Sequence, residues 1–191
     1  MTGFAPLLRR ELHAHLLSPA SYLVAALFLL VAGTGFWISV ASLAAQSDSS
    51  ADLLELSSWT FLLTIAATAP LLTMRLFAEE YRSGTFETLM TAPVRPAAVV
   101  LAKYFAALLW FLGMLVPTLL WGPILSALAA VPPAADPAAY AGACLGVVLI
   151  GAWCLALGLL ASALMRSQVT AALLAIALIG GWLFAGWLPF L

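Results

Sequence analysis

Charged side chains are missing from five long stretches of this chain, and this limits what the chain can fold into. The stretches cover residues 18–46, 57–74, 104–135, 139–164 and 169–190. Each is long enough for a helix to cross the hydrocarbon core of a bilayer, which takes about 17–25 residues. Only 8% of the chain is charged and 65% is hydrophobic, whereas about 25% of a soluble domain is charged. We therefore predict an all-α integral membrane protein with lipid as its solvent.

Five transmembrane helices are predicted within a single membrane domain, residues 1–191. Their ranges are 20–42, 57–74, 98–122, 139–164 and 169–190. The uncharged run at 104–135 is counted as one span, because two spans would have only about 16 residues each. Lys103 lies at the inner end of the third span, where we expect its ammonium group to extend toward the lipid headgroups.

Residues 1–17 are predicted to form an amphipathic helix that lies in the membrane interface. Leu8, Leu12 and Leu16 recur at intervals of four, which places them on one helical face. The other directions carry Arg9, Arg10, Glu11, His13 and His15. The two histidines do not share a face, so we interpret them as solvated or facing headgroups. No metal site is predicted, because metal ligands have to converge.

One charged segment, residues 75–97, separates the second span from the third. We expect the second helix to continue through residue 82, beyond the lipid, with its charged side chains in water. Gly84 should break this helix, since glycine permits positive φ, and a short helix should follow at 85–91. The positions of interest are Arg75, Glu79, Glu80, Arg82, Gly84, Thr85 and Glu87. Spacing alone also allows a plain solvated connector.

The basic residues predict how the chain crosses the membrane. If residues 75–97 lie inside, five alternating spans place all seven lysine and arginine residues inside. The acidic residues at 48, 52, 55 and 136 then lie outside. This distribution follows the positive-inside rule, so the N-terminus is predicted to be cytoplasmic and the C-terminus to lie outside.

Small and hydroxyl residues recur at helical spacing within the spans. The stripe Thr60, Thr64 and Thr68 indicates either packing, with hydroxyls bonded to the carbonyl one turn earlier, or the lining of a pathway. The pairs Gly142–Gly146 and Gly158–Ser162 predict close helix contacts. Cys144 and Cys154 are separated by about 15 Å along a helix, too far for a disulfide.

Several functions lack the residues that they need. The chain has no G-x-x-x-x-G-K-[ST] phosphate loop and no H-E-x-x-H motif, so it is not expected to be an enzyme or to hydrolyse ATP itself. No ionisable residue lies in the middle of a span, which argues against a proton-coupled carrier. No basic face is available for nucleic acid. Whatever drives this protein is expected to come from a partner.

The charged segment resembles a known family. The run RLFAEEYRSGTFETLMTAPV at 75–94 is similar to the cytoplasmic motif of ABC exporter permeases of the second type, and looks closest to their gliding-motility-associated branch. LRREL at 8–12, SPASYLV at 18–24, LAKYFAA at 101–107 and the Pro-Thr pair at 117–118 also fit. The resemblance is specific over about residues 7–121, and beyond that it is mostly hydropathy.

The resemblance implies a permease subunit of an ATP-driven exporter in the bacterial cytoplasmic (inner) membrane. It implies cytoplasmic ABC ATPase subunits that carry ATP and Mg, and a second permease copy or a sister permease. Residues Arg75, Glu79, Glu80, Arg82, Gly84, Thr85 and Glu87 would form the ATPase-coupling region, and Arg9, Arg10 and Glu11 would belong to the interface helix. The family has six spans, so the last one is expected to be absent here.

Two other functions stay open at this point. A membrane scaffold or assembly protein that transports nothing would fit the missing span. A secondary carrier or membrane enzyme would need a reactive centre within the membrane, and the threonine stripe is its nearest candidate.

Overall fold

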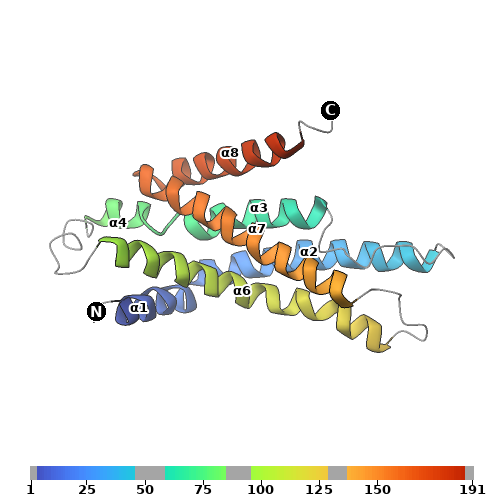
Figure 1. The fold of residues 1–191 in the computed structure, drawn as a ribbon. Coiled ribbons are helices and arrows are strands. Elements are labelled where there is room, and N and C mark those ends of the chain that lie inside the picture. The colour runs from blue at the N-terminus through green and yellow to red at the C-terminus, as the bar shows by residue number, and fades with distance from the viewer. Residues whose placement is uncertain (1–3, 46–58, 85–95, 129–136, 188–191) are drawn as a thin grey trace.

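The computed structural model describes residues 4–45, 59–84, 96–128 and 137–187, and nearly all of these residues are helical (Figure 1). The helices are α1 Phe4–Leu17, α2 Pro19–Ala45, α3 Trp59–Thr73, α4 Ala78–Ser83, α6 Pro96–Leu128, α7 Pro137–Leu164 and α8 Gln168–Trp187. Five segments are long and apolar enough to cross a membrane: Pro19–Ile38, Thr60–Tyr81, Pro96–Ile124, Tyr140–Leu164 and Gln168–Gly186. The predicted all-α membrane fold with five spans is confirmed.

The long helices α2, α3, α6 and α7 lie side by side along one axis, with α8 packed on α7 and α3 (Figure 1). Helix α1 packs along the first part of α6. Helices α1 and α4, the start of α6 and the α7–α8 turn gather at one end of the bundle (Figure 1). These are the elements that the sequence placed inside; which face of the membrane this end meets stays a prediction.

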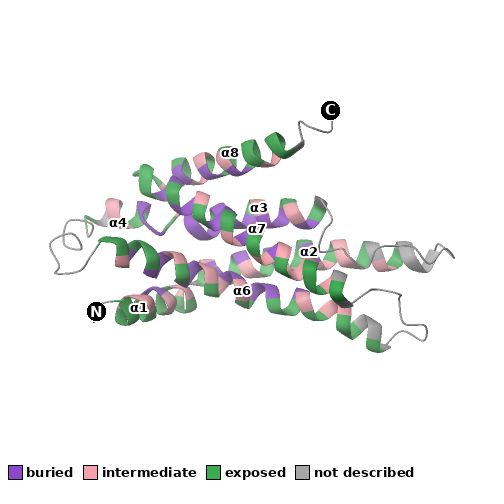
Figure 2. Ribbon diagram, in the orientation of Figure 1, coloured by how far each residue is buried: buried purple, intermediate pink, exposed green. Residues whose placement is uncertain are grey.

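Helix α3 is the centre of the bundle. In the span that begins in α3, Thr60–Tyr81, 61% of the most apolar stretch is buried inside the protein. The corresponding share is 17% in α2 and 17% in α8. The largest buried side chains come from several helices and include Phe28, Ile65, Phe111, Leu155 and Ile179. Many large apolar side chains point outward instead, on the outer faces of α2, α6, α7 and α8 (Figure 2). This pattern suits lipid, because hydrocarbon carries no cost for exposed leucine or isoleucine.

The second helix does not continue through residue 82 as expected. Helix α3 ends at Thr73, residues 74–77 form a turn, and the chain becomes helical again at Ala78. In the turn, the Leu76 amide donates to the Thr73 carbonyl over 3.1 Å, a tighter pattern than the α-helical one. Helix α4 is therefore a separate short element, divided from α3 by the turn at 74–77.

Two glycines of α7 allow its neighbours to come close. A Cβ at Gly151 would overlap the Phe111 ring of α6, and a Cβ at Gly158 would overlap the Thr73 side chain at the end of α3. The predicted close contact at Gly158 and Ser162 is therefore found. The expected contact at Gly142–Gly146 is not found within the described chain, since both positions face open space there.

Candidate functional site

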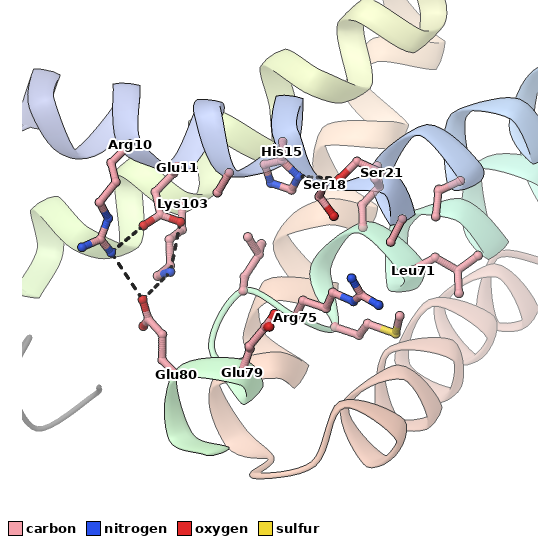
Figure 3. Close-up of a pocket in the computed structure, with 16 residues that line it drawn as sticks. Arg10, Glu11, His15, Ser18, Ser21, Leu71, Arg75, Glu79, Glu80 and Lys103 are labelled. Atoms are coloured by element: carbon pink, nitrogen blue, oxygen red, sulfur yellow. Dashed lines mark hydrogen bonds and ion pairs between the residues drawn. The ribbon is translucent and has the colours of Figure 1, made fainter. Parts of the chain in front are cut away.

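An ionic cluster joins three elements that are far apart in the sequence. It consists of Arg10 and Glu11 from α1, Glu80 from α4 and Lys103 from α6 (Figure 3). The Lys103 Nζ lies 2.8 Å from Glu80 Oε1 and 3.2 Å from Glu11 Oε2. The Arg10 guanidinium donates to Glu11 Oε1 at 2.9 Å and lies 3.6 Å from Glu80 Oε1. Two cations thus alternate with two carboxylates, and the cluster is neutral as a whole.

Lys103 is the centre of this cluster and has almost no contact with solvent. The residue is 2% exposed, and its ammonium also lies 5.4 Å from the centre of the Phe77 ring. The expectation that Lys103 extends to the headgroups is wrong. A buried ammonium needs local compensation, and Glu80 and Glu11 provide it from either side.

Two carboxylates also differ from their predicted environments. Glu80 was expected in water, but its side chain is only 15% exposed. Glu11 was expected on the polar face of an interfacial helix, but it is buried and faces α6. The physical reason is the same for both: each pairs with Lys103, which is fixed on α6. The buried residue of α1 is therefore Glu11, whereas Leu8 and Leu12 are only partly buried and Leu16 is exposed.

A cavity of about 440 Å³ adjoins the cluster, between the α1–α2 junction and the α3–α4 turn (Figure 3). The lining includes the cluster itself together with Arg75 and Glu79, which are both exposed residues. Two hydroxyl residues also line it: Ser18, between α1 and α2, and Ser21, in the first turn of α2. Of the seven predicted coupling positions, the fold thus brings Arg75, Glu79 and Glu80 to this cavity.

The remaining predicted positions do not line this cavity or lie outside the described residues. Arg9 is exposed on α1. Arg82 belongs to α4, and Gly84 ends that helix with φ of 71°, the left-handed conformation that glycine adopts readily, as predicted. Thr85 and Glu87, with the predicted helix at 85–91, lie outside the described residues.

Both histidines were predicted to be solvated or to face headgroups. His13 is exposed, whereas His15 is only partly exposed and its ring lies against α6. Its ring stacks on the indole of Trp110 with centres 6.3 Å apart. Its Nδ1 lies 3.5 Å from Ser21 Oγ, while its Nε2 is buried and has no hydrogen-bond partner in the described part of the chain. Burial lowers the pKa of His15 below its usual value; nearby Glu11 opposes this shift and Lys103 adds to it.

The threonine stripe bonds to its own helix. Thr64 donates to the Thr60 carbonyl and Thr68 to the Thr64 carbonyl, each over 2.7 Å. Thr64 and Thr68 are buried, while Thr60 is exposed. This is the back-bonding that the first of the two interpretations of the stripe contained, and it gives both buried hydroxyls an acceptor within their own helix.

Sequence reasoning missed Lys103 and His15 as members of the site. For Lys103 a signal was available, because it is the one charged residue in the predicted third span, and such residues usually face the protein interior and pair there. For His15 no comparable signal exists in the sequence. The described residues contain no group of three or more His, Cys, Asp or Glu placed to hold a metal.

Comparison with known proteins gives one family. A family model described as ABC-2 family transporter protein matches residues 13–183, which is most of the chain. No curated protein and no solved structure matches significantly.

Proposed function

Because the chain belongs to the ABC-2 family of transporter proteins, we propose that it is an exporter permease subunit whose α4 region transmits ATPase motion to the spans. Membership implies a permease subunit of an ABC transporter and an ABC ATPase partner. Export and the gliding-motility-associated branch are finer parts of the proposal, supported by the residue patterns at 8–24 and 75–94. The proposal also places the end of the bundle that holds α1 and α4 on the cytoplasmic side of the membrane.

The observation that carries the proposal is the ionic cluster. Helix α4 is short and lies between the turn at 74–77 and Gly84, and in this proposal it is the unit on which the ATPase acts. Glu80 binds it to Lys103 of α6, and Lys103 binds α6 to Glu11 of α1. Separating Glu80 from Lys103 would remove one of the two carboxylates that compensate this buried ammonium, which is costly. A displacement of α4 therefore either moves α6 and α1 with it or breaks the ion pairs of the cluster.

The exposed carboxylate beside Glu80 offers a matched control. Glu79 is exposed, whereas Glu80 is bound within the cluster. In nanodiscs that contain the permease and its copurifying ATPase, Glu80→Gln should leave the complex assembled but reduce the effect of the permease on the rate of ATP hydrolysis. Glu79→Gln should leave that effect intact in the assembled complex, because the Glu79 side chain is exposed and lies outside the cluster.

Different results would contradict different parts of the proposal. If Glu80→Gln and Glu79→Gln behave alike, the cluster does not transmit motion. If a stable complex purifies from native membranes without any ATP-hydrolysing subunit, the chain is instead a scaffold or assembly protein. The orientation is tested with Arg75→Cys. If a membrane-impermeant thiol reagent labels position 75 from outside intact cells, the assumed orientation is wrong.

A further inference from the structure

The turn between α3 and α4 is held by a side chain of α7. Ser162 Oγ accepts hydrogen bonds from the amides of Phe77 and Ala78, at 3.1 and 3.3 Å. The same hydroxyl donates to the Met74 carbonyl over 3.3 Å. Ser162 is 0% exposed, so water does not compete for these bonds.

These bonds answer a need that the turn itself leaves open. The last carbonyls of one helix and the first amides of the next have no partners within their own helices, and unbonded backbone groups are costly in an apolar environment. Phe77 stands at the N-cap of α4 and makes no side-chain cap bond. A hydroxyl from α7 therefore does what a local serine or threonine cap normally does.

Further contacts run along the same face of α7. Gly158, one turn before Ser162, allows Thr73 to approach closely. Leu159 packs in one buried cluster with Leu76 and Phe77. Beyond Ser162, the Ala163 carbonyl accepts a hydrogen bond from the Tyr81 hydroxyl over 3.4 Å. The end of α7 thus follows the chain from the last residue of α3 into α4.

We propose that α7 is a second receiver of α4 motion, with Ser162 as the positioning residue that joins them. This inference rests on the proposed function and adds a route to it. The ionic cluster ties α4 to α6 and α1 through Glu80, while Ser162 ties the beginning of α4 to α7. A displacement of α4 then reaches helices on two sides of the bundle, so α7 shifts relative to α6.

The joint is tested first without any partner. In the chain reconstituted in nanodiscs, Ser162→Ala should speed amide hydrogen exchange at Phe77 and Ala78 by about fivefold, the effect of losing one hydrogen bond. Ser167→Ala is the matched control, because Ser167 is exposed in the turn after α7 and should change neither amide. Unchanged exchange in Ser162→Ala would show that the hydroxyl does not hold the turn.

The transmission is then tested with the ATPase bound. Cys154 is a buried thiol on α7, so its alkylation rate by N-ethylmaleimide, in a Cys144→Ala background, reports opening around α7. ATP should change this rate at least about twofold in the parent complex, and Ser162→Ala should remove most of the ATP response while the ATPase stays bound. Tyr81→Phe, a milder change at the same joint, should reduce the response in part and covers the case that Ser162→Ala fails to fold.

The outcomes separate this inference from the function on which it rests. If no ATP-hydrolysing subunit copurifies, the proposed function fails, and the exchange result still decides whether Ser162 holds the turn. If the ATPase is bound and active but ATP leaves the Cys154 rate unchanged in the parent, α7 receives no motion and the inference is overturned. A full ATP response in a folded Ser162→Ala complex would remove the role assigned to Ser162.

Discussion

Replacing Lys103 by methionine tests whether the ionic cluster holds α1, α4 and α6 together. Methionine is similar in length to lysine but has no charge, so the packing stem is kept and the ammonium is lost. Glu11 and Glu80, whose side chains are only 11% and 15% exposed, then lose their shared partner. The change therefore isolates the electrostatic part of the contact.

The expected cost follows from what remains after the substitution. Removing one partner from a buried ion pair costs about 3–5 kcal/mol, because a charge is left uncompensated. Arg10 stays within 2.9 Å of Glu11 and 3.6 Å of Glu80, but its side chain is 58% exposed, so it compensates the carboxylates only in part. We expect Lys103→Met to lower the free energy of unfolding by about 2–4 kcal/mol.

The assay is unfolding in mixed micelles with increasing SDS, followed by tryptophan fluorescence. The control is the triple variant Lys103→Met, Glu11→Gln, Glu80→Gln, which removes both uncompensated carboxylates and should recover stability to within about 1 kcal/mol of the parent. A single Lys103→Met variant within about 0.5 kcal/mol of the parent would refute the reasoning. So would a triple variant no more stable than the single one.

Three further changes are predicted from the same structure. Arg10→Gln should cost no more than about 1 kcal/mol in that titration, because an exposed ion pair contributes little; a loss as large as that of Lys103→Met would contradict the assigned burial. Burial lowers the pKa of His15 in the folded protein below the usual histidine value of about 6.5, which applies to the unfolded chain. Just below a pH of about 6.5, the unfolded chain therefore binds more protons than the folded one. Stability should therefore fall as the pH drops through about 6.5, and His15→Gln should flatten this dependence while His13→Gln, at an exposed position, should not. Gly158→Ala should cost about 1–3 kcal/mol through overpacking, whereas Gly142→Ala, which faces open space, should cost nothing in the same measurement.

The membrane fold could be predicted because it depends on local composition. A run of about 20 residues without charge has to find an apolar solvent, whatever its neighbours do, so the five spans and their order were readable. The break at Gly84 was also local, because positive φ at that position favours glycine. Back-bonding by Thr64 and Thr68 follows from spacing within one helix.

The environment of each charge could not be read in the same way. Lys103, Glu80 and Glu11 are separated by long stretches of sequence, and the preference of each alone is for water. They become buried only when α1 and α4 dock on either side of α6 and each charge supplies the partner that another requires. The same holds for Ser162, whose hydroxyl caps a turn some 80 residues away in the chain.

The amino-acid sequence by itself determined that this is an all-helical membrane protein, and that five of its helices are long and apolar enough to cross a bilayer. Hydrophobicity and backbone preference act on neighbouring residues, so these properties need no knowledge of the fold. Only the tertiary structure decided that the interface helix and the short helix α4 meet at one buried lysine, and that α7 holds the turn before α4. Ion pairs and side-chain caps depend on distances between helices, and those distances exist only once the helices have packed.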